Sequence, residues 1–138
     1  LIGRTLTVAV LSVGLAFISP AQAIAPKMLE MRTPIFAKSF AKSQLPYWGW
    51  GKGQWTCLNQ LWQNESNWRP SAYNHTPVYM WINGKRKAFH AGGIPQRLGL
   101  SPKASVPIQV NVGLTYIKNR YKSPCGALKW WNNRHYWY

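Results

Sequence analysis

The segment WTCLNQLWQNESNW, residues 55–68, combines a strong helical pattern with an isolated carboxylate, Glu65. Its apolar side chains recur at helical spacing, at Trp55, Leu58, Leu61 and Trp62. This period predicts an amphipathic helix with one apolar stripe and with Glu65 near its end. The only other acidic residue of the chain is Glu30. Glu65 could pair with a basic residue at the surface, but its isolation among tryptophans favours a functional role.

A β-hairpin is predicted after this helix, in residues 78–90, VYMWINGKRKAFH. An Asn-Gly pair between two β-prone runs is the signal of a type I′ turn. The resulting register pairs Val78 with Phe89, Tyr79 with Ala88 and Trp81 with Arg86. The basic residues 85–87 at the tip form either a solvated hairpin end or an arm that grips an anionic polymer.

Two further helices are predicted. Residues 105–121 form the first, with Ser105 as a possible N-cap and Pro107 in the first turn. Its core stripe is expected from Ile108, Val112, Leu114 and Ile117, with Gln109, Gly113 and Tyr116 on a neighbouring face. Residues 125–134 form the last short helix. The chain is therefore expected to contain one small, mainly helical α+β domain with a single hairpin.

The region before the domain is expected to be a flexible basic linker over residues 24–46, because prolines and lysines interrupt any period. Residues 36–40 could make one helical turn within it. The domain itself is expected over residues 47–138. It opens with a Gly-aromatic turn whose Trp48 and Trp50 serve either as sugar-stacking platforms or as a lid on a small core, and we favour the lid.

The first 23 residues have the organisation of a secretory signal peptide. Arg4 precedes an apolar run over residues 5–18, and Pro20 and an Ala-Gln-Ala site follow it. A retained membrane anchor is the alternative, but the run is short for a bilayer span. We therefore predict export to the periplasm, the cell envelope or the medium, with no stable membrane insertion after the signal is removed.

The charge balance indicates an anionic partner. The chain has 17 Lys and Arg against two acidic residues, a net charge of +15, and removal of Arg4 with the signal would leave +14. Such a field attracts polyanions. For an exported protein, an anionic wall polymer is a better candidate than nucleic acid, for which no recognition motif is present. Nine Trp and seven Tyr would stack equally well on sugars or bases.

The two cysteines, Cys57 and Cys125, fit an oxidising compartment. A disulfide would tie the Glu65 helix to the C-terminal segment; two free buried thiols are the alternative. Neither cysteine has a second Cys or His at the spacing of a metal finger, so no metal or cofactor is expected.

The scarcity of carboxylates restricts the chemistry. Glycosidases with two carboxyl groups, aspartic proteases, carboxylate-bridged metal sites and Ser-His-Asp triads all need acids that the domain lacks. A Cys-His nucleophile remains formally possible, although no motif surrounds His75, His90 or His135. One glutamate is sufficient when the N-acetyl group of the substrate attacks the anomeric carbon. The glutamate then acts first as an acid and later as a base.

Residues 91–96, AGGIPQ, form a candidate ligand loop. Gly92 and Gly93 would allow the backbone to approach a ligand closely, and Pro95 would stiffen the segment that presents Gln96. The Gln96 amide both donates and accepts hydrogen bonds, which suits an acetamido group or the orientation of a carboxyl.

Three motifs together resemble one family. Glu65-Ser66, the Gly-Ile-Pro-Gln of residues 93–96 and the Gly-Leu-x-Tyr-Ile of residues 113–117 are similar, in order and spacing, to the soluble-type lytic transglycosylase domains of the lysozyme-like superfamily. Cys125, Ala127 and the aromatic tail resemble a secreted or phage-associated branch. The resemblance covers residues 47–138. It implies a lysozyme-like fold. The hairpin is expected to form part of the substrate groove, and the protein is expected to be a monomer.

By this resemblance, Glu65 would be the catalytic acid and base, with Ser66 as its hydrogen-bonding neighbour. Gln96 and the backbone of Gly93 would contact the sugar near the cleaved bond, and Tyr116 would position the glutamate or the intermediate. The remaining candidate substrate-binding residues are Asn74, Ile94 and Gln109. The chain departs from the family at Pro95, where Met is usual, at Gln109, where Asn is frequent, and in the longer link over residues 76–90.

The resemblance also implies the reaction. The β-1,4 bond after N-acetylmuramic acid in peptidoglycan glycan strands would be cleaved without water, leaving a 1,6-anhydro sugar. A lysozyme-type muramidase, in which water is the acceptor, and a non-catalytic cationic wall-binding or membrane-active protein are the alternatives. Desolvation by Trp62 or Trp68 is expected to outweigh the screened positive field and to raise the pKa of Glu65, which predicts a mildly acidic optimum.

Overall fold

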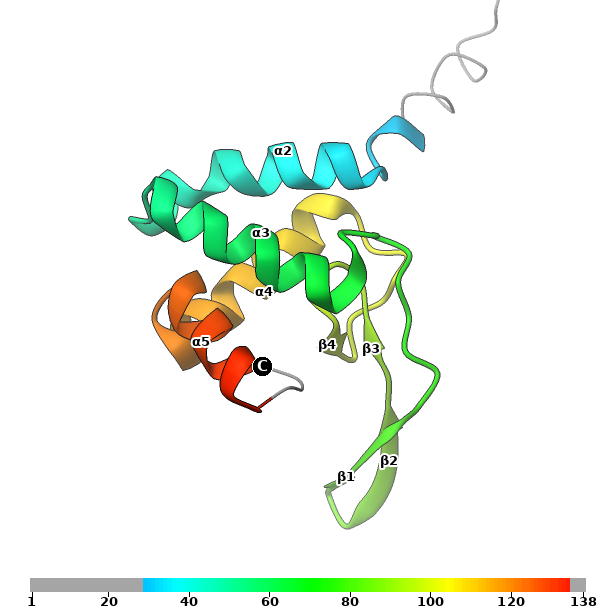
Figure 1. The fold of residues 1–138 in the computed structure, drawn as a ribbon. Coiled ribbons are helices and arrows are strands. Elements are labelled where there is room, and N and C mark those ends of the chain that lie inside the picture. The colour runs from blue at the N-terminus through cyan, green and yellow to red at the C-terminus, as the bar shows by residue number, and fades with distance from the viewer. Residues whose placement is uncertain (1–28, 135–138) are drawn as a thin grey trace, which may run out of the picture.

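The computed structural model describes residues 29–134, which form a mainly helical domain with a small antiparallel hairpin, as predicted (Figure 1). The helices are α2 (Pro34–Gln44), the 3₁₀ helix η1 (Leu45–Trp48), α3 (Lys52–Ser66), α4 (Val106–Tyr121) and α5 (Pro124–Arg134). The strands are β1 (Val78–Ile82), β2 (Lys85–Phe89), β3 (Ala91–Gly92) and β4 (Arg97–Leu98). The predicted signal peptide and the last four residues lie outside the described part. None of the described helices is long and apolar enough to cross a membrane.

Helix α2 corrects the prediction of a flexible linker over residues 24–46 for the part that the structure describes; residues 24–28 lie outside that part. Thr33 caps this helix, because its hydroxyl oxygen accepts a hydrogen bond of 3.1 Å from the backbone N–H three residues later. Pro34 occupies the first turn, where a backbone N–H is not needed. Ala37 and Ala41 are fully buried, so their small side chains let α2 pack closely against α4. Pro34 therefore begins a helix of the domain instead of interrupting one.

Helix α3 is the helix predicted from the apolar period at residues 55–68, although it begins three residues earlier and ends two residues earlier. Three residues of the predicted stripe, Leu58, Leu61 and Trp62, are fully buried, and the fourth, Trp55, is partly buried against the core. Helix α5 packs against α3, and the disulfide Cys57–Cys125 joins the two helices. The bridged alternative is thus confirmed, and a covalent bond holds α5 beside the helix that contains Glu65.

Helix α4 confirms the predicted helix of residues 105–121 but corrects part of its stripe. Leu114 and Ile117 are buried as expected, whereas Ile108 is 55% exposed and Val112 is 37% exposed. The buried residues of the helix are Val106, Gln109, Val110, Gly113, Leu114 and Ile117. The row that faces the core includes a glycine and a glutamine, so apolar character alone did not identify it.

The hairpin has the predicted register at every pair. Asn83 and Gly84 both have left-handed backbone, with φ of 51° and 72°, as a type I′ turn requires. Figure 1 shows β1 and β2 projecting from the helical body as a separate two-stranded ribbon. Its side chains are largely exposed, and Trp81 is the most exposed of its large apolar residues at 74%.

The Gly-aromatic turn overlaps the end of η1 and contributes its two tryptophans to the core. Trp50 is buried, and the partly buried Trp48 stacks on it with ring centroids 5.6 Å apart. This packing agrees with the expected lid and leaves Trp50 no free face large enough for a sugar ring.

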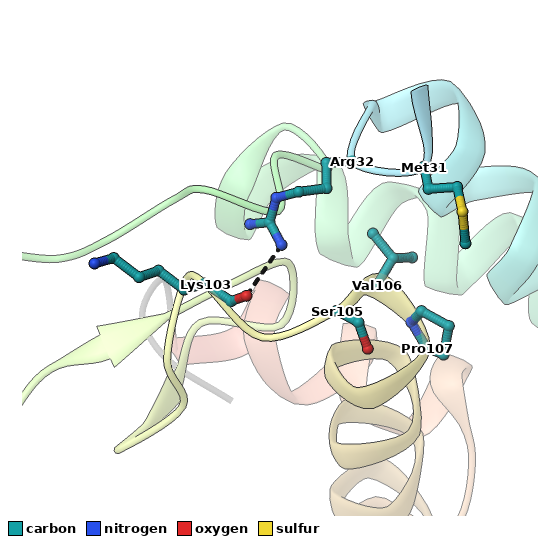
Figure 2. A pocket seen from close by; sticks show the side chains of 6 residues that line it. All are labelled: Met31, Arg32, Lys103, Ser105, Val106 and Pro107. Carbon is teal, nitrogen blue, oxygen red and sulfur yellow. Dashed lines mark hydrogen bonds between the residues drawn. The ribbon is translucent and has the colours of Figure 1, made fainter. Parts of the chain in front are cut away.

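Arg32 fastens the N-terminal segment to the loop that precedes α4. Its guanidinium donates to three successive carbonyl oxygens, those of Pro102 (2.6 Å), Lys103 (3.2 Å) and Ala104 (2.9 Å). Figure 2 shows this side chain pointing at the loop, beside a pocket at the start of α4. The loop leads directly into the helix that supports the candidate site.

Candidate active site

Glu65 lies in the last turn of α3, and aromatic packing fixes the end of that helix. Asn67 and Trp68 have left-handed backbone, with φ of 52° and 59°, so the chain turns sharply after the helix. Trp68 is fully buried: its indole N–H donates to the carbonyl of Asn59 at 3.1 Å, and its ring meets that of Trp62 edge-on at 5.1 Å. A bulky residue with positive φ is strained and persists only where packing holds it. The carboxyl therefore sits on a rigid support.

The carboxyl of Glu65 is strongly desolvated. Burial raises its pKa from 4.5 to about 7, and a hydrogen bond from the side chain of Trp131 acts in the opposite direction. Its Oε1 atom is buried without a hydrogen-bond partner among the described residues. The neighbourhood of this carboxyl thus favours a protonated acid at neutral pH.

Ser66 and Gln109 connect the end of α3 to the loop of residues 93–96. The Ser66 hydroxyl donates to the carbonyl of Ile94 at 2.7 Å, and the Ile94 N–H donates to Oε1 of Gln109 at 2.8 Å. The amide nitrogen of Gln109 donates to the carbonyls of Pro70 (2.9 Å) and Ala104 (2.8 Å). This network ties the segments at Pro70, Ile94 and Ala104 to the fully buried side chain of Gln109.

These bonds correct three of the predicted substrate contacts. Ile94 and Gln109 are 0% exposed and Ser66 is 3% exposed, so none of them presents a side chain to a ligand. The partner of the Ser66 hydroxyl is the Ile94 carbonyl instead of the Glu65 carboxyl. Because a buried amide or hydroxyl needs partners, the polar character of Ser66 and Gln109 is explained by internal bonds. All three act on the site only through the loop they hold.

The loop glycines are required by the protein's own packing. A Cβ atom on Gly92 would lie 2.2 Å from the carbonyl oxygen of Leu100, and one on Gly93 would lie 2.6 Å from Oε1 of Gln109. Gly93 also has a φ of 71°. The close approach expected at these glycines is therefore made to other parts of the chain. The segment is tightly built, which favours a defined position for Gln96.

Gln96 and Tyr116 are only partly buried, unlike Ser66, Ile94 and Gln109. Gln96 has a φ of 46°, unusual for a residue with a side chain, and its amide nitrogen donates to the carbonyl of Gly93 at 2.9 Å. This bond uses one of the two N–H groups of the amide, so the amide oxygen and the second N–H are left for a ligand. Tyr116 is partly buried, and the guanidinium of Arg97 lies 3.3 Å from its ring centroid.

Asn74 stands at the base of the hairpin. Its Oδ1 accepts the N–H of Thr76 at 2.9 Å, and its own N–H donates to the carbonyl of Ala91 at 2.8 Å. An Asx turn of this kind orients the chain as it enters β1. The structure thus gives the Asn74 side chain a local backbone partner, and the predicted sugar contact has no support from this geometry.

Three side chains near the site were not identified from the sequence: Trp131, Arg97 and Tyr121. Trp131 reaches Glu65 only because α5 packs along α3, and no local pattern encodes that contact. The one available hint was the cysteine pair, since Glu65 follows Cys57 by eight residues and Trp131 follows Cys125 by six. A bridge between two helices brings the turns that follow it into the same region.

No group of three or more His, Cys, Asp or Glu side chains within residues 29–134 is arranged to hold a metal ion. Comparison of the chain with protein-family models, with curated proteins and with solved structures found no match.

Proposed function

We propose that this chain is a secreted, peptidoglycan-cleaving lytic transglycosylase that uses Glu65 as its single acid and base. The observation that supports this most is a desolvated carboxyl with a pKa of about 7 in a chain of only two acidic residues. Such a group still holds a proton at neutral pH and can donate it. The other acid, Glu30, is exposed in the N-terminal segment, so a second catalytic carboxyl is not offered.

In the proposed reaction, Glu65 donates its proton to the bridging oxygen of the β-1,4 bond as that bond breaks. The N-acetyl group of the substrate attacks the anomeric carbon, so the protein supplies no nucleophile. The carboxylate then accepts the proton of the 6-hydroxyl as this oxygen closes onto the anomeric carbon and displaces the acetamido oxygen. The product is a 1,6-anhydro sugar, and the acid is restored.

The neighbouring side chains fit these steps. The Trp131 hydrogen bond favours the charged carboxylate that exists between the two proton transfers. Gln96 offers an amide oxygen for the acetamido N–H of the sugar. Ser66 and Gln109 hold the backbone around Gln96, so they contribute by position and do not touch the substrate.

Digestion of purified sacculi by the wild type and by Glu65→Gln tests the proposal. We expect soluble muropeptides with anhydro ends from the wild type, and a rate lower by about 100- to 10,000-fold for the variant. The mass of the products decides the acceptor, because a muramidase would leave ends heavier by one water. Failure of the wild type to release any muropeptide would refute an enzymatic role.

A non-enzymatic cationic wall-binding protein is the second candidate. The observations in its favour are the net charge of +15 and the exposed basic residues 85–87 at the tip of the projecting hairpin. Such a field attracts anionic wall polymers over distances of about 8 Å at physiological salt. In that case Glu65→Gln would bind sacculi as tightly as the wild type, and neither protein would release fragments.

A further inference from the structure

Two arginines flank a pair of tyrosines beside the candidate site. Arg97 directly follows Gln96 in the chain, and its guanidinium lies 3.3 Å from the ring centroid of Tyr116. Arg120, in the last turn of α4, lies 5.8 Å from the same ring and 5.6 Å from that of Tyr121. The two tyrosine rings meet edge-on at 5.8 Å. Both guanidinium groups therefore lie near the ring of Tyr116.

This surface is connected to Glu65 through α5. The ring of Tyr121 contacts that of Trp130 at 5.7 Å, and the next residue, Trp131, hydrogen-bonds the Glu65 carboxyl. On the other side, Arg97 adjoins Gln96, which we assign to substrate binding. A ligand bound at Gln96 would therefore lie near Arg97, the next residue in the chain.

The charge of the two arginines is not balanced by acids of the chain. The chain has only two glutamates and no aspartate, compared with 17 Lys and Arg residues. Glu30 is exposed in the N-terminal segment, and the pKa of Glu65 responds to burial and to Trp131. Both guanidinium groups also lower the pKa of Tyr121, against the larger opposing effect of burial, so their charges are felt at this surface.

We propose that Arg97 and Arg120, held against Tyr116 and Tyr121, form a clamp for a carboxylate that the glycan substrate carries. This proposal rests on the proposed function, and it specifies which feature of the substrate the site selects. A guanidinium stacked on a ring keeps its N–H groups directed outward in its own plane, where they match the two oxygens of a carboxylate. Lysine lacks this planar fork, which makes the choice of arginine informative.

Two carboxylates of peptidoglycan have this chemistry. One is the lactyl group of muramic acid in strands without peptides, and the other is a carboxylate of the stem peptide. Both would be absent from a neutral oligomer of N-acetylglucosamine, which has the same sugar backbone. These three ligands therefore separate the clamp from general sugar binding and separate the two sources from each other.

The test measures binding by calorimetry in the Glu65→Gln background, so that the ligands are not cleaved. Arg97→Gln is expected to weaken binding of carboxylated strands by about ten- to a hundredfold and binding of the neutral oligomer by less than twofold. Arg120→Gln should act in the same direction, and Arg97→Lys should recover only part of the loss. Loss with peptide-free strands assigns the lactyl carboxylate; loss only with peptide-bearing strands assigns the stem peptide.

Lys118→Gln is the matched control, because Lys118 is an exposed cation on α4 whose ammonium lies 5.8 Å from the ring of Trp50. An equal loss in this control would mean that net charge alone is responsible, and would overturn the clamp. An equal loss of neutral and carboxylated ligands in Arg97→Gln would also overturn it, since that result indicates packing.

Turnover measurements with Glu65 intact keep the two proposals apart. The clamp predicts a higher KM for Arg97→Gln with kcat nearly unchanged on carboxylated strands. If the wild type makes anhydro products and Arg97→Gln has an unchanged KM, the clamp is wrong and the proposed function stands. If the protein neither binds nor cleaves any of the glycans, both proposals are wrong.

Discussion

Replacing Glu65 with Gln is expected to make the protein more stable, by an amount that depends on pH. The carboxyl has a pKa of about 7 in the folded protein against an ordinary value of 4.5. Below pH 4.5 it is protonated in both the folded and the unfolded chain, so it has no effect on stability. Between pH 4.5 and 7 the unfolded chain releases the proton while the folded chain retains it, so stability falls as the pH rises.

The magnitude follows from the same two values. At about 1.4 kcal/mol for each unit of pKa, the difference between 4.5 and about 7 amounts to about 3 kcal/mol above pH 7. Glutamine has a similar shape, has no charge to desolvate and can still accept the hydrogen bond from Trp131. We therefore expect the unfolding free energy of Glu65→Gln to equal that of the wild type near pH 4 and to exceed it by about 3 kcal/mol at pH 8. The corresponding difference in Tm is about 10 °C.

Urea and thermal unfolding at pH 4, 6 and 8 measure this difference. Glu30→Gln is a matched control, since it removes the only other acidic side chain and changes the net charge equally, but from an exposed position. A stabilisation of Glu65→Gln that is constant from pH 4 to 8, or that Glu30→Gln reproduces, would refute the conclusion that this carboxyl is desolvated.

Three other outcomes follow from the geometry. Trp131→Phe removes a hydrogen bond that favours the carboxylate, so it should raise the pKa of Glu65. The alkaline fall of kcat/KM, which is expected near pH 7 in the wild type, should then move about one pH unit higher. An unchanged pH profile would contradict the assigned bond. Ser66→Ala leaves a buried carbonyl without its donor and should cost about 1–3 kcal/mol in urea unfolding, whereas a neutral effect would show that the loop does not depend on this bond. Replacement of both Cys57 and Cys125 by Ala opens a loop with a sequence separation of 68 and should lower the unfolding free energy by about 4 kcal/mol. Dithiothreitol should destabilise the wild type to the same extent and should not affect the variant.

Local signals predicted most of the regular structure. The Asn-Gly pair at residues 83–84 was sufficient for the register of the hairpin, because a type I′ turn permits one pairing of its flanking strands. The helix with Glu65 followed from its apolar period, which repeats at 3.6 residues wherever the partner surface lies. Helix α2 was missed because Pro34 at its start and Pro46 just after its end were interpreted as breaks, and its buried stripe consists of small alanines that give a weak hydrophobic pattern.

The candidate site was predicted less evenly. Glu65 was singled out because carboxylates are so scarce, and scarcity is a property of composition that needs no coordinates. The roles expected for Ile94 and Gln109 were wrong, because a residue type in a motif does not reveal whether its polar groups face a ligand or another segment of the chain. Both side chains are fully buried. Only long-range packing brings the start of α4 under the loop that contains Ile94.

By itself, the order of residues determined the elements with strong local periods, the isolation of Glu65 in a chain with one other acidic residue, and the excess of positive charge. These are local or compositional properties. Tertiary structure alone decided how far Glu65 is removed from water, that Trp131 bonds it, and that Arg97 and Arg120 both lie near the ring of Tyr116. Each of these depends on contacts between helices and loops that are distant in the chain, and desolvation in particular is a property of what surrounds a group in space.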